Sequence, residues 1–319
     1  MWHAGEPLAL PISFYREAFG LQDKWNTRGV QVINSFQTNA TLITQEWCDF
    51  FKAHSVKIGV SLDGPVQIHD AHRVDRAGKG SFHRALRGID LLQRNGIQYA
   101  LIAVITKDSV HHPDELWKFF MDLRPVRLGF NPEEVEGIHK YSSLQTDEDV
   151  EQYKAFFKHI LILSVDTHNP VIVREIGTLI DRIVFGPHLT RSQTNVPMKL
   201  LSFDYDGNIS TFSPELLNMT SPTHGNFIFG NVFEHTLDDV LTNQKFLEVN
   251  AQIQQGVEMC RETCEYFMFC GGGSPSNKLF EKGTFCCTET TACRMHIQAP
   301  TSAIIEHMEE AYHITSPAK

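Results

Sequence analysis

Apolar residues in the first half of the chain follow two alternating periodicities. Short apolar runs typical of buried strands alternate with longer stretches in which apolar residues recur every three or four positions, as in a helix. We predict strands at residues 30–36, 56–62, 99–105 and 126–130. The stretches between and after them open with helix-starting residues, which are Thr44, Ser81, Pro113 and Thr146. This alternation predicts an α/β fold with a parallel sheet, either open or curled into a barrel.

The second half of the chain has a different pattern. Residues 186–197 lack periodicity and are predicted to be a linker, and residues 198–212 are typical of a hairpin with an Asp-Gly turn. A capped helix is predicted to begin at Thr236 and to run to about Val249. From Cys260 onward the sequence is rich in cysteine and glycine. The predicted domains are therefore residues 1–190 and residues 191–319.

The composition narrows the class of protein. The chain has 319 residues, a net charge of −10 and 42% hydrophobic residues, as is typical of a globular protein. The acidic balance argues against a nucleic-acid surface, and no apolar run is long enough for a membrane span. The first residues have neither the basic nor the apolar segment of a signal peptide, so we expect a cytoplasmic protein. In a reducing compartment, clustered cysteines are more often metal ligands or catalytic groups than disulfides.

Polar residues follow the predicted strands. Because the carboxyl ends of parallel strands meet at one rim, the loops after them are candidates for a site. Loops are polar because they face water, so one polar loop alone is weak evidence for a functional site. Five such loops together favour a site, and they are residues 5–7, 37–39, 61–65, 106–108 and 131–134.

Four of the seven cysteines form a pattern that is typical of a metal centre. They follow the spacing Cys260-x3-Cys264-x5-Cys270, then three glycines, and later Cys293. Four thiolates in a loop-rich segment suit either a four-iron cluster or a structural zinc ion. Zinc sites favour Cys-x2-Cys pairs, which this pattern lacks, whereas glycines let the backbone approach a bulky cluster and present N–H groups to its sulfurs. The spacing therefore favours an iron–sulfur cluster.

The other three cysteines are weaker candidates. Cys286 and Cys287 are adjacent, so at most one of them can bind the same metal centre, and we predict that both are spare thiols. The sequence leaves open whether one of them contributes. Cys48 lies beside Trp47 on a predicted helix, and we predict that it packs in the core.

Two groups of motifs resemble those of radical S-adenosylmethionine (SAM) enzymes with a C-terminal SPASM-type auxiliary cluster domain. One group comprises residues 2–8, with Gly-Glu-Pro, residues 37–40, and residues 61–65, with Ser-Leu-Asp-Gly-Pro. The other is the tail from Cys264 to Cys293, with Cys-Gly-Gly-Gly-Ser-Pro-Ser-Asn-Lys, which is most similar to the cyclophane-forming peptide maturases of the Grr/Osc type. The resemblance implies a (β/α)6 radical SAM barrel, partial in this chain, followed by a small SPASM-type iron–sulfur domain.

The resemblance also implies a SAM site on the barrel. Glu6 would accept a hydrogen bond from the SAM amino group, and Ser61 would bind the ribose or the carboxylate. Arg73 would pair with the SAM carboxylate, although without the resemblance it also fits a solvated charge beside a helix. Asn131 would lie beside the adenosyl group. The implied SAM-binding residues are Gly5, Glu6, Ser61, Asp63, Arg73 and Asn131.

The sequence departs from the family pattern in two places. The Cys-x3-Cys-x2-Cys motif that holds the SAM-cleaving cluster is absent, so the catalytic residues remain unassigned and we expect an N-terminal truncation or a misplaced start. A barrel without its first strand would expose an unpaired strand edge. Ser213 occupies the place of a further SPASM cysteine, so we expect one auxiliary four-iron cluster rather than two.

The resemblance implies radical modification of a peptide. The expected reaction joins a side-chain carbon of a ribosomally made precursor peptide to an aromatic ring carbon, giving a cyclophane. Its cofactors would be SAM and a [4Fe–4S] cluster, and its partners the peptide and an electron donor such as a flavodoxin or ferredoxin. Two alternatives remain: a non-catalytic fragment or pseudoenzyme that binds a peptide and one cluster, and an oxidase similar to the anaerobic sulfatase maturases. The oligomeric state is not predicted.

Overall fold

The computed structural model describes residues 1–137, 139–166, 171–186, 191–217 and 219–312. The chain divides into two compact units. One comprises Met1–Asn131 and His159–Gly177, and the other comprises Pro132–Lys158 and Thr178–Lys319. The predicted domain boundary at residue 190, and part of the predicted linker, fall on residues 187–190, which lie outside the described residues. That boundary stays a prediction.

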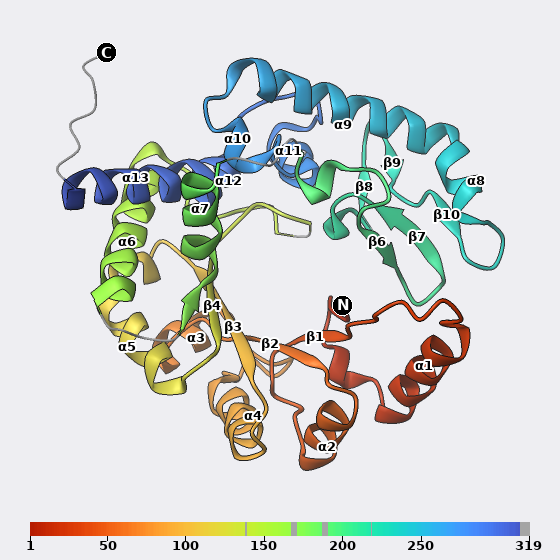
Figure 1. Ribbon diagram of the computed structural model, residues 1–319, viewed down its shortest axis with the longest axis horizontal. Coiled ribbons are helices and arrows are strands. Elements are labelled where there is room, and N and C mark those ends of the chain that lie inside the picture. The colour runs from red at the N-terminus through yellow and green to blue at the C-terminus, as the bar shows by residue number, and fades with distance from the viewer. Residues whose placement is uncertain (138, 167–170, 187–190, 218, 313–319) are drawn as a thin grey trace. The chain divides into compact units, whose positions relative to one another are not determined.

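The first unit is built on a parallel sheet. Its strands are β1 (Ser35–Thr38), β2 (Lys57–Ser61), β3 (Tyr99–Ile105), β4 (Arg127–Pro132) and β5 (Ile172–Val173). They lie in the order β1-β2-β3-β4-β5 (Figure 1), and the pairs β1–β2, β2–β3 and β4–β5 are parallel. In β3 every second side chain is fully buried, because the alternation of strand side chains turns them to the same face. The prediction of an α/β fold with a parallel sheet is confirmed.

Three of the four predicted helix starts have the expected capping contact or proline, whereas Ser81 precedes a helix but makes no capping hydrogen bond. Thr44 accepts a hydrogen bond from the backbone of Trp47 (3.3 Å) at the start of α2, and Pro113 opens α5. Thr146 and Asp149 cap α6 with reciprocal hydrogen bonds (3.1 and 2.9 Å). Figure 1 shows α2 and α4 on the outer side of the strands. The helices of this part of the chain are α1 (Ile12–Trp25), α2 (Gln45–Ala53), α3 (Val66–His72), α4 (Phe82–Arg94), α5 (Pro113–Leu123), α6 (Asp147–Asp166) and α7 (Arg174–Val184).

The predicted strand over residues 30–36 is wrong for most of its length. Pairing begins only at Ser35, and Val30 and Ile33 are each 61% exposed. The Asn26 side chain holds the backbone of Val30 in a loop through two hydrogen bonds (2.6 and 2.8 Å). The β-branched residues here favour a strand locally, but a strand also needs a neighbour to pair with.

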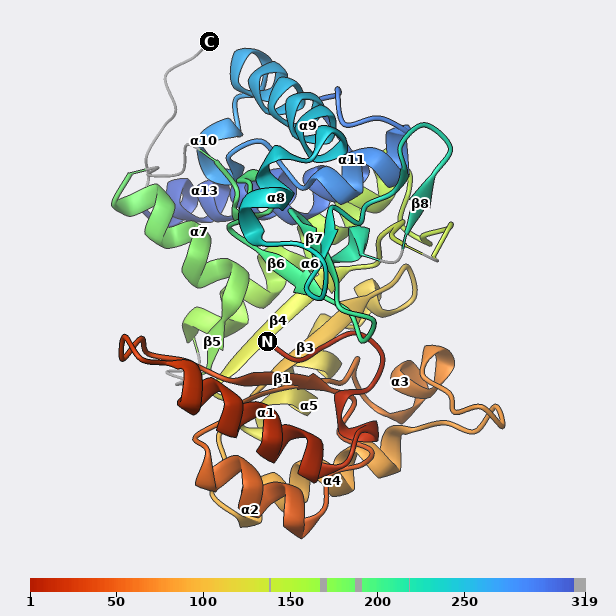
Figure 2. The same ribbon diagram turned by 90° about the vertical axis from the view of Figure 1, so that its right-hand side faces the viewer.

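Helix α1 was not predicted from the sequence. It lies alongside β1 (Figure 2), where Tyr15 and Phe19 are buried. The ring of Tyr15 packs edge-on against Trp2 (5.1 Å between centroids) and Phe36 (4.8 Å). Trp2 pairs with Phe36 in a parallel bridge, so the first residues of the chain join the sheet next to β1.

The second unit combines a small sheet with helices. Strands β6 (Leu201–Phe203) and β7 (Asn208–Thr211) form the predicted hairpin, and Gly207 takes the left-handed conformation (φ 80°) that its turn requires. Strand β10 (Gly230–Asn231) pairs antiparallel to β7, and β8 (Thr220–Ser221) pairs with β9 (Gly225–Asn226). The helices of this unit are α8 (Leu237–Thr242), α9 (Gln244–Thr263), α10 (Phe267–Cys270), α11 (Pro275–Lys282), α12 (Thr291–Cys293) and α13 (Ala299–Tyr312).

The predicted helix from Thr236 to about Val249 is two helices. Its start is correct, since Thr236 and Asp239 form a capping box, but α8 ends at Thr242. Asn243 then caps α9 by accepting a hydrogen bond from the Phe246 backbone (3.2 Å). Helix α9 delivers Cys260 to the cysteine-rich segment. Within the described residues, no helix is long and apolar enough to cross a membrane.

Candidate functional site

The four predicted cluster ligands line one cavity of about 330 Å³ in the second unit. Cys260 lies in the last turn of α9, and Cys264 follows directly after that helix. Cys270 ends α10 and Cys293 ends α12. Four side chains from three helix ends are thus gathered around one space, although 33 positions separate the first from the last.

Each of these sulfurs faces at least one N–H donor. Cys260 receives a side-chain ammonium, and the other three receive backbone N–H groups, which is how proteins hold cluster thiolates. The donor to Cys260 is Lys278 Nζ (3.3 Å), and the donor to Cys264 is the Tyr266 N–H. Cys270 accepts from the N–H groups of Gly272 and Gly273, and Cys293 accepts from the Thr290 N–H (3.4 Å).

The three glycines after Cys270 shape this loop. Gly271, Gly272 and Gly273 all have positive φ (67°, 100° and 76°), which side chains other than glycine rarely adopt. A Cβ on Gly271 would lie 2.4 Å from the backbone of Arg191. Asn195 fixes the loop by donating to the carbonyls of Gly271 (2.8 Å) and Gly273 (3.3 Å). The strained conformation turns two successive N–H groups toward the Cys270 sulfur.

The residues present fit a four-iron cluster. Burial raises the pKa of the Cys264 and Cys270 thiols, and it raises the pKa of Cys293 to about 11. A metal centre would replace these protons and use the N–H donors already aimed at the sulfurs. Sulfurs that share one zinc ion lie about 4 Å apart, given a Zn–S distance of about 2.3 Å. A cavity of about 330 Å³ suits a polyatomic cluster better. Among the described residues, no group of three or more histidine, cysteine or acidic side chains converges on a single-ion position.

The remaining cysteines lie elsewhere. The Cys286 sulfur contacts the Gln255 side-chain oxygen (3.2 Å), and the Cys287 sulfur contacts the Thr284 carbonyl (3.6 Å). Neither lines the cavity of the four cysteines. Cys48 is fully buried, so its predicted place in the core is confirmed. Ser213 is buried, and its hydroxyl contacts that of Ser274 (3.1 Å).

In the first unit, Glu6 joins the Gly-Glu-Pro loop to the end of β1. Its carboxylate accepts hydrogen bonds from the Thr38 hydroxyl (2.7 Å), the Asn39 backbone (2.8 Å) and the Leu8 backbone (3.0 Å). Gly5, just before it, has φ 61° with open space where a Cβ would be. Two of the five polar loops are therefore brought together. Because a carboxylate has about four acceptor positions, Glu6 retains room for a further donor.

Asp63 and Arg73 form a two-pronged ion pair at the end of β2. The guanidinium contacts both Asp63 oxygens (2.5 and 2.9 Å), and the Asp63 side chain is only 6% exposed. Asp63 also accepts a hydrogen bond from the Val104 backbone on β3 (3.0 Å). Nearby, the Ser61 hydroxyl accepts a hydrogen bond from Gln37 (2.9 Å). Arg73 is thus bound to Asp63. The alternative from sequence, a solvated charge beside a helix, does not describe it.

Buried His69 supports this arrangement. One ring nitrogen faces the Asp63 backbone N–H (3.3 Å), and the other contacts the Ser81 hydroxyl (3.0 Å), which itself donates to the Arg73 carbonyl (3.0 Å). Burial lowers the pKa of His69, with the Asp63 charge opposing the shift. This role of His69 was not predicted from the sequence, because its partners lie up to 12 positions away.

Asn131 lies near the end of β4 and accepts a hydrogen bond from the Arg174 side chain (2.5 Å). Within the described residues, no hydrogen bond links it to Glu6 or to the Asp63–Arg73 pair.

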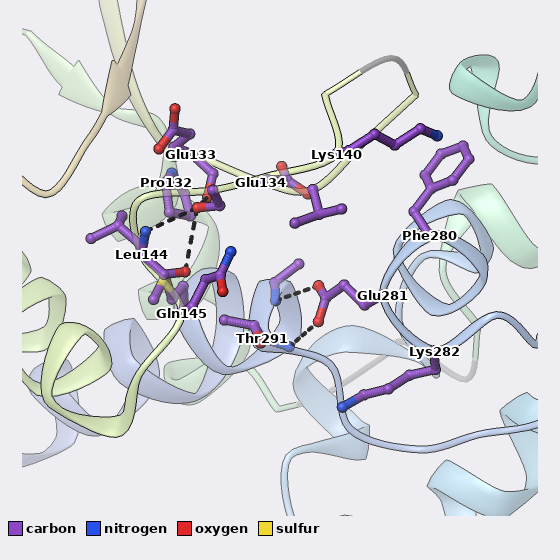
Figure 3. A pocket seen from close by; sticks show the side chains of 14 residues that line it. Pro132, Glu133, Glu134, Lys140, Leu144, Gln145, Phe280, Glu281, Lys282 and Thr291 are labelled. Atoms are coloured by element: carbon purple, nitrogen blue, oxygen red, sulfur yellow. Dashed lines mark hydrogen bonds between the residues drawn. The ribbon is translucent and has the colours of Figure 1, made fainter.

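A second cavity of about 310 Å³ lies in the second unit (Figure 3). Two of its carboxylates already bind protein groups. Glu281 accepts hydrogen bonds from the backbone of Thr291 (2.5 Å) and Ala292 (2.9 Å), and Glu133 accepts two from Ser143 (2.6 and 2.5 Å). The Glu281 hydrogen bonds hold the start of α12, which carries Cys293.

Glu134 belongs to a group of three partly buried acids, with Glu136 and Glu215. Its carboxylate contacts His296 (2.8 Å). Burial acts to raise the pKa of Glu134, but the His296 charge and hydrogen bonds from His296 and Asn277 outweigh it, so the pKa is lowered. Burial, with repulsion from Glu134 and Glu215, raises the pKa of Glu136 to about 8. Glu136 is therefore protonated at neutral pH, unlike Glu134.

Known proteins with similar sequences cover most of the chain, although no family model matches it. The uncharacterized protein sll1766 of Synechocystis sp. is 43% identical over 314 residues, which are 97% of this chain and 79% of that protein. The serine-type anaerobic sulfatase-maturating enzyme of Bacteroides thetaiotaomicron is 26% identical over 293 residues, covering 87% of this chain and 69% of that enzyme.

Solved structures show the same fold. Native anSMEcpe with bound AdoMet and Kp18Cys peptide superposes with a TM-score of 0.78 at 21% identity, covering 98% of this chain and 84% of that one. Streptococcus suis SuiB bound to S-adenosylmethionine gives a TM-score of 0.55 at 16% identity, covering 81% and 59%. The chain belongs to the family of sll1766, and its more distant relatives include anaerobic sulfatase-maturating enzymes.

Proposed function

We propose that this protein is a radical SAM peptide maturase that holds one auxiliary [4Fe–4S] cluster and crosslinks side chains of a ribosomally made precursor peptide. One observation carries the cluster: the sulfurs of four cysteines line one cavity, and each faces an N–H donor. The maturase class is supported by the sulfatase-maturating relatives and by the SuiB structure bound to its precursor peptide SuiA. In this reading the first unit is a partial radical SAM barrel and the second a SPASM-type domain.

SAM would lie at the carboxyl ends of the strands of the first unit. We assign its amino group to Glu6 and the Gly5 backbone, its ribose or carboxylate to Ser61, and its adenosyl group to Asn131. Arg73 uses two of its five N–H groups on Asp63 and is 30% exposed, so it retains donors for the SAM carboxylate. Asp63 then orients Arg73 and need not contact SAM itself.

The cluster that cleaves SAM does not fit the residues of this chain. Cys48 is the only cysteine before Cys260, and it is fully buried. The cofactors supply the radical chemistry, and an electron donor such as a flavodoxin or ferredoxin, in the cytoplasm, would supply the reducing equivalents. The residues described above bind and orient SAM and the auxiliary cluster.

A second candidate is oxidation of a serine or cysteine in a sulfatase. It is favoured by the 26% identity to the Bacteroides enzyme over 69% of that enzyme's length. The crosslinking reaction is favoured by the resemblance of the segment from Cys264 to Cys293, and by Ser213, which leaves ligands for one auxiliary cluster.

The two reactions give different products. The chain, joined to a Cys-x3-Cys-x2-Cys segment that can hold the SAM-cleaving cluster, would be incubated with SAM, a strong reductant and either a precursor peptide rich in aromatic residues or a sulfatase-derived peptide. Crosslinking removes two hydrogens and leaves a peptide that resists fragmentation between the joined residues. Serine oxidation also removes two hydrogens but creates an aldehyde that reacts with a hydrazine. We expect the crosslink, and an aldehyde in the sulfatase peptide alone would contradict the proposal.

A further inference from the structure

Lys278, on α11, is a buried cation beside one of the proposed cluster ligands. Its side chain is 4% exposed, and its ammonium lies 3.3 Å from the Cys260 sulfur and 2.7 Å from the Gly256 carbonyl. Lysines are almost never fully buried unless they are paired. Among the ion pairs of the described residues, none joins Lys278 to a carboxylate. A sulfur and one carbonyl are therefore its partners.

The surrounding fold makes room for this contact. A Cβ on Gly256 would lie 3.2 Å from the Lys278 ammonium and 2.0 Å from the Phe285 carbonyl, so only glycine lets α9, α11 and the following loop pack this closely. A Cβ on Gly273 would lie 3.8 Å from the Lys278 Cε, so the stem of Lys278 packs beside the glycine loop that follows Cys270. Lys278 thus joins α9, which carries Cys260, to the glycine loop beside Cys270.

The contact suits a sulfur that binds a metal centre better than a neutral thiol. A neutral thiol is a weak hydrogen-bond acceptor and offers a buried ammonium little compensation, whereas a thiolate gives a charge-assisted bond. We propose that Lys278 sets the reduction potential of the auxiliary cluster through Cys260. This inference rests on the cluster of the proposed function.

The direction of the effect follows from charge. Four thiolates around a [4Fe–4S] core make a dianion when the core is oxidised and a trianion after it accepts one electron from an external reductant. A fixed cation beside one thiolate stabilises the trianion more than the dianion. Lys278 therefore favours the reduced state, and hydrogen bonds and net charge are known determinants of cluster potentials.

The test compares reduction potentials of matched variants of the full chain. Lys278→Met removes the charge and the donor, whereas Lys278→Gln removes the charge and keeps an N–H donor. Lys282→Met is the matched control, because Lys282 lies one turn later on α11 and lines the other cavity (Figure 3). After anaerobic reconstitution, iron content is measured first, followed by a redox titration of the reduced cluster monitored by electron paramagnetic resonance.

We expect about four irons in all four proteins. At a fixed applied potential, the ratio of reduced to oxidised cluster should fall about tenfold in Lys278→Met, a shift of about 59 mV for one electron. Lys278→Gln should shift in the same direction, and Lys282→Met should match the wild type. A purely structural role would change the melting temperature but not the potential.

The outcomes separate the two proposals. Wild-type protein without iron overturns the cluster itself. Wild-type protein with about four irons, together with unchanged potentials in Lys278→Met and Lys278→Gln, leaves the cluster standing and overturns the role of Lys278. Loss of iron from both Lys278 variants also overturns it, because Lys278 would then be needed for assembly rather than for tuning.

Discussion

Single residues in both units act mainly through the neighbours that the fold supplies. Arg73 is held by Asp63, Glu6 is held by the loop after β1, and the Cys260 sulfur faces Lys278. Each contact joins residues at least 10 positions apart in sequence. The effect of replacing one partner therefore depends on what remains buried and unpaired afterwards.

Cys293→Ala should abolish most of the iron–sulfur absorbance after anaerobic reconstitution. Cys293 is one of the four cysteines that line the cavity. A four-iron cluster is held by four thiolates, and the variant leaves three. Cys286→Ala is the matched control, because that thiol belongs to the same segment but contacts Gln255 instead. Full absorbance in Cys293→Ala, or loss of absorbance in Cys286→Ala, would show that the ligand set is different. A colourless wild-type protein with one zinc ion would refute the iron–sulfur assignment.

Asp63→Ala should lower the free energy of unfolding by about 2–4 kcal/mol. It leaves Arg73 without its carboxylate and the Val104 N–H without its acceptor. Urea denaturation monitored by circular dichroism measures the change. Asp75→Ala, which removes a more exposed partner of Arg84, should have little effect. Equal losses in the two variants would mean that burial does not govern the Asp63–Arg73 pair.

Glu136→Gln should stabilise the protein, and more so at alkaline pH. The native carboxyl has a pKa of about 8 against an ordinary value of 4.5, so the folded state holds a proton that the unfolded state releases. Wild-type stability therefore falls as the pH rises from about 4.5 to about 8. Glutamine removes this loss, and the gain should reach about 2–4 kcal/mol at pH 8.5.

Urea midpoints at pH 5 and pH 8.5 test this, with Glu262→Gln, an exposed residue of α9, as the control. The charged groups that raise the pKa of Glu136 are Glu134 and Glu215; Glu134 in turn contacts His296, and His139 pairs with the Glu136 backbone. A stabilisation that is independent of pH would show that Glu136 is ionised in the folded protein.

At the scale of elements, the sequence predicted those helices and strands whose positions are set by residues close by in the chain. The starts of α2, α5, α6 and α8 are set by capping side chains or proline within three residues, and β3 by its own apolar run. The strand predicted over residues 30–34 was wrong because the pattern suits a strand locally, whereas among the described residues only Asn34, at its end, receives a backbone hydrogen bond from β2. Helix α1 was missed because its buried face is defined by partners such as Trp2 and Phe36, which precede and follow it in the chain.

In the cysteine-rich segment too, local features could be predicted from sequence, whereas contacts between distant residues could not. The spacing of four cysteines with three glycines predicts a ligand set, and the structure places these four cysteines around one cavity. The spacing gave no indication of Lys278, which lies 18 positions from Cys260 and approaches it only because α9 and α11 pack together. Likewise, the sequence could not show that Arg73 is bound by Asp63, because a loop conformation decides that contact.

Gly271→Ala and Gly283→Ala should separate backbone strain from crowding. Both glycines have positive φ (67° and 70°), so alanine should cost each about 1–2 kcal/mol. A Cβ on Gly271 would also lie 2.4 Å from the Arg191 backbone, whereas Gly283 has open space. We expect Gly271→Ala to lose iron and more stability, and Gly283→Ala to keep its iron. The measurements are iron content and urea unfolding, and equal behaviour would contradict a crowding effect.

At the scale of the whole molecule, the inventory of cysteines limits what this chain can bind. Seven cysteines are present, and four line the cavity of the second unit. Cys286 and Cys287 face protein oxygens, and Cys48 is fully buried within the first unit. No Cys-x3-Cys-x2-Cys motif occurs in the sequence. The 319 residues therefore provide a thiolate set for one four-iron cluster.

The 319-residue chain should accordingly bind about four irons rather than about eight, and with SAM and a strong reductant it should form no 5′-deoxyadenosine. SAM cleavage needs a cluster with one iron free to bind SAM, whereas the auxiliary cluster has a cysteine for each iron. The measurements are iron and sulfide analysis and chromatography of the reaction mixture. The matched variant is Cys48→Ser, which removes the only thiol outside the tail. Turnover that disappears in Cys48→Ser would show that Cys48 supports a second cluster. Turnover that persists would mean that the tail cysteines both hold a cluster and cleave SAM.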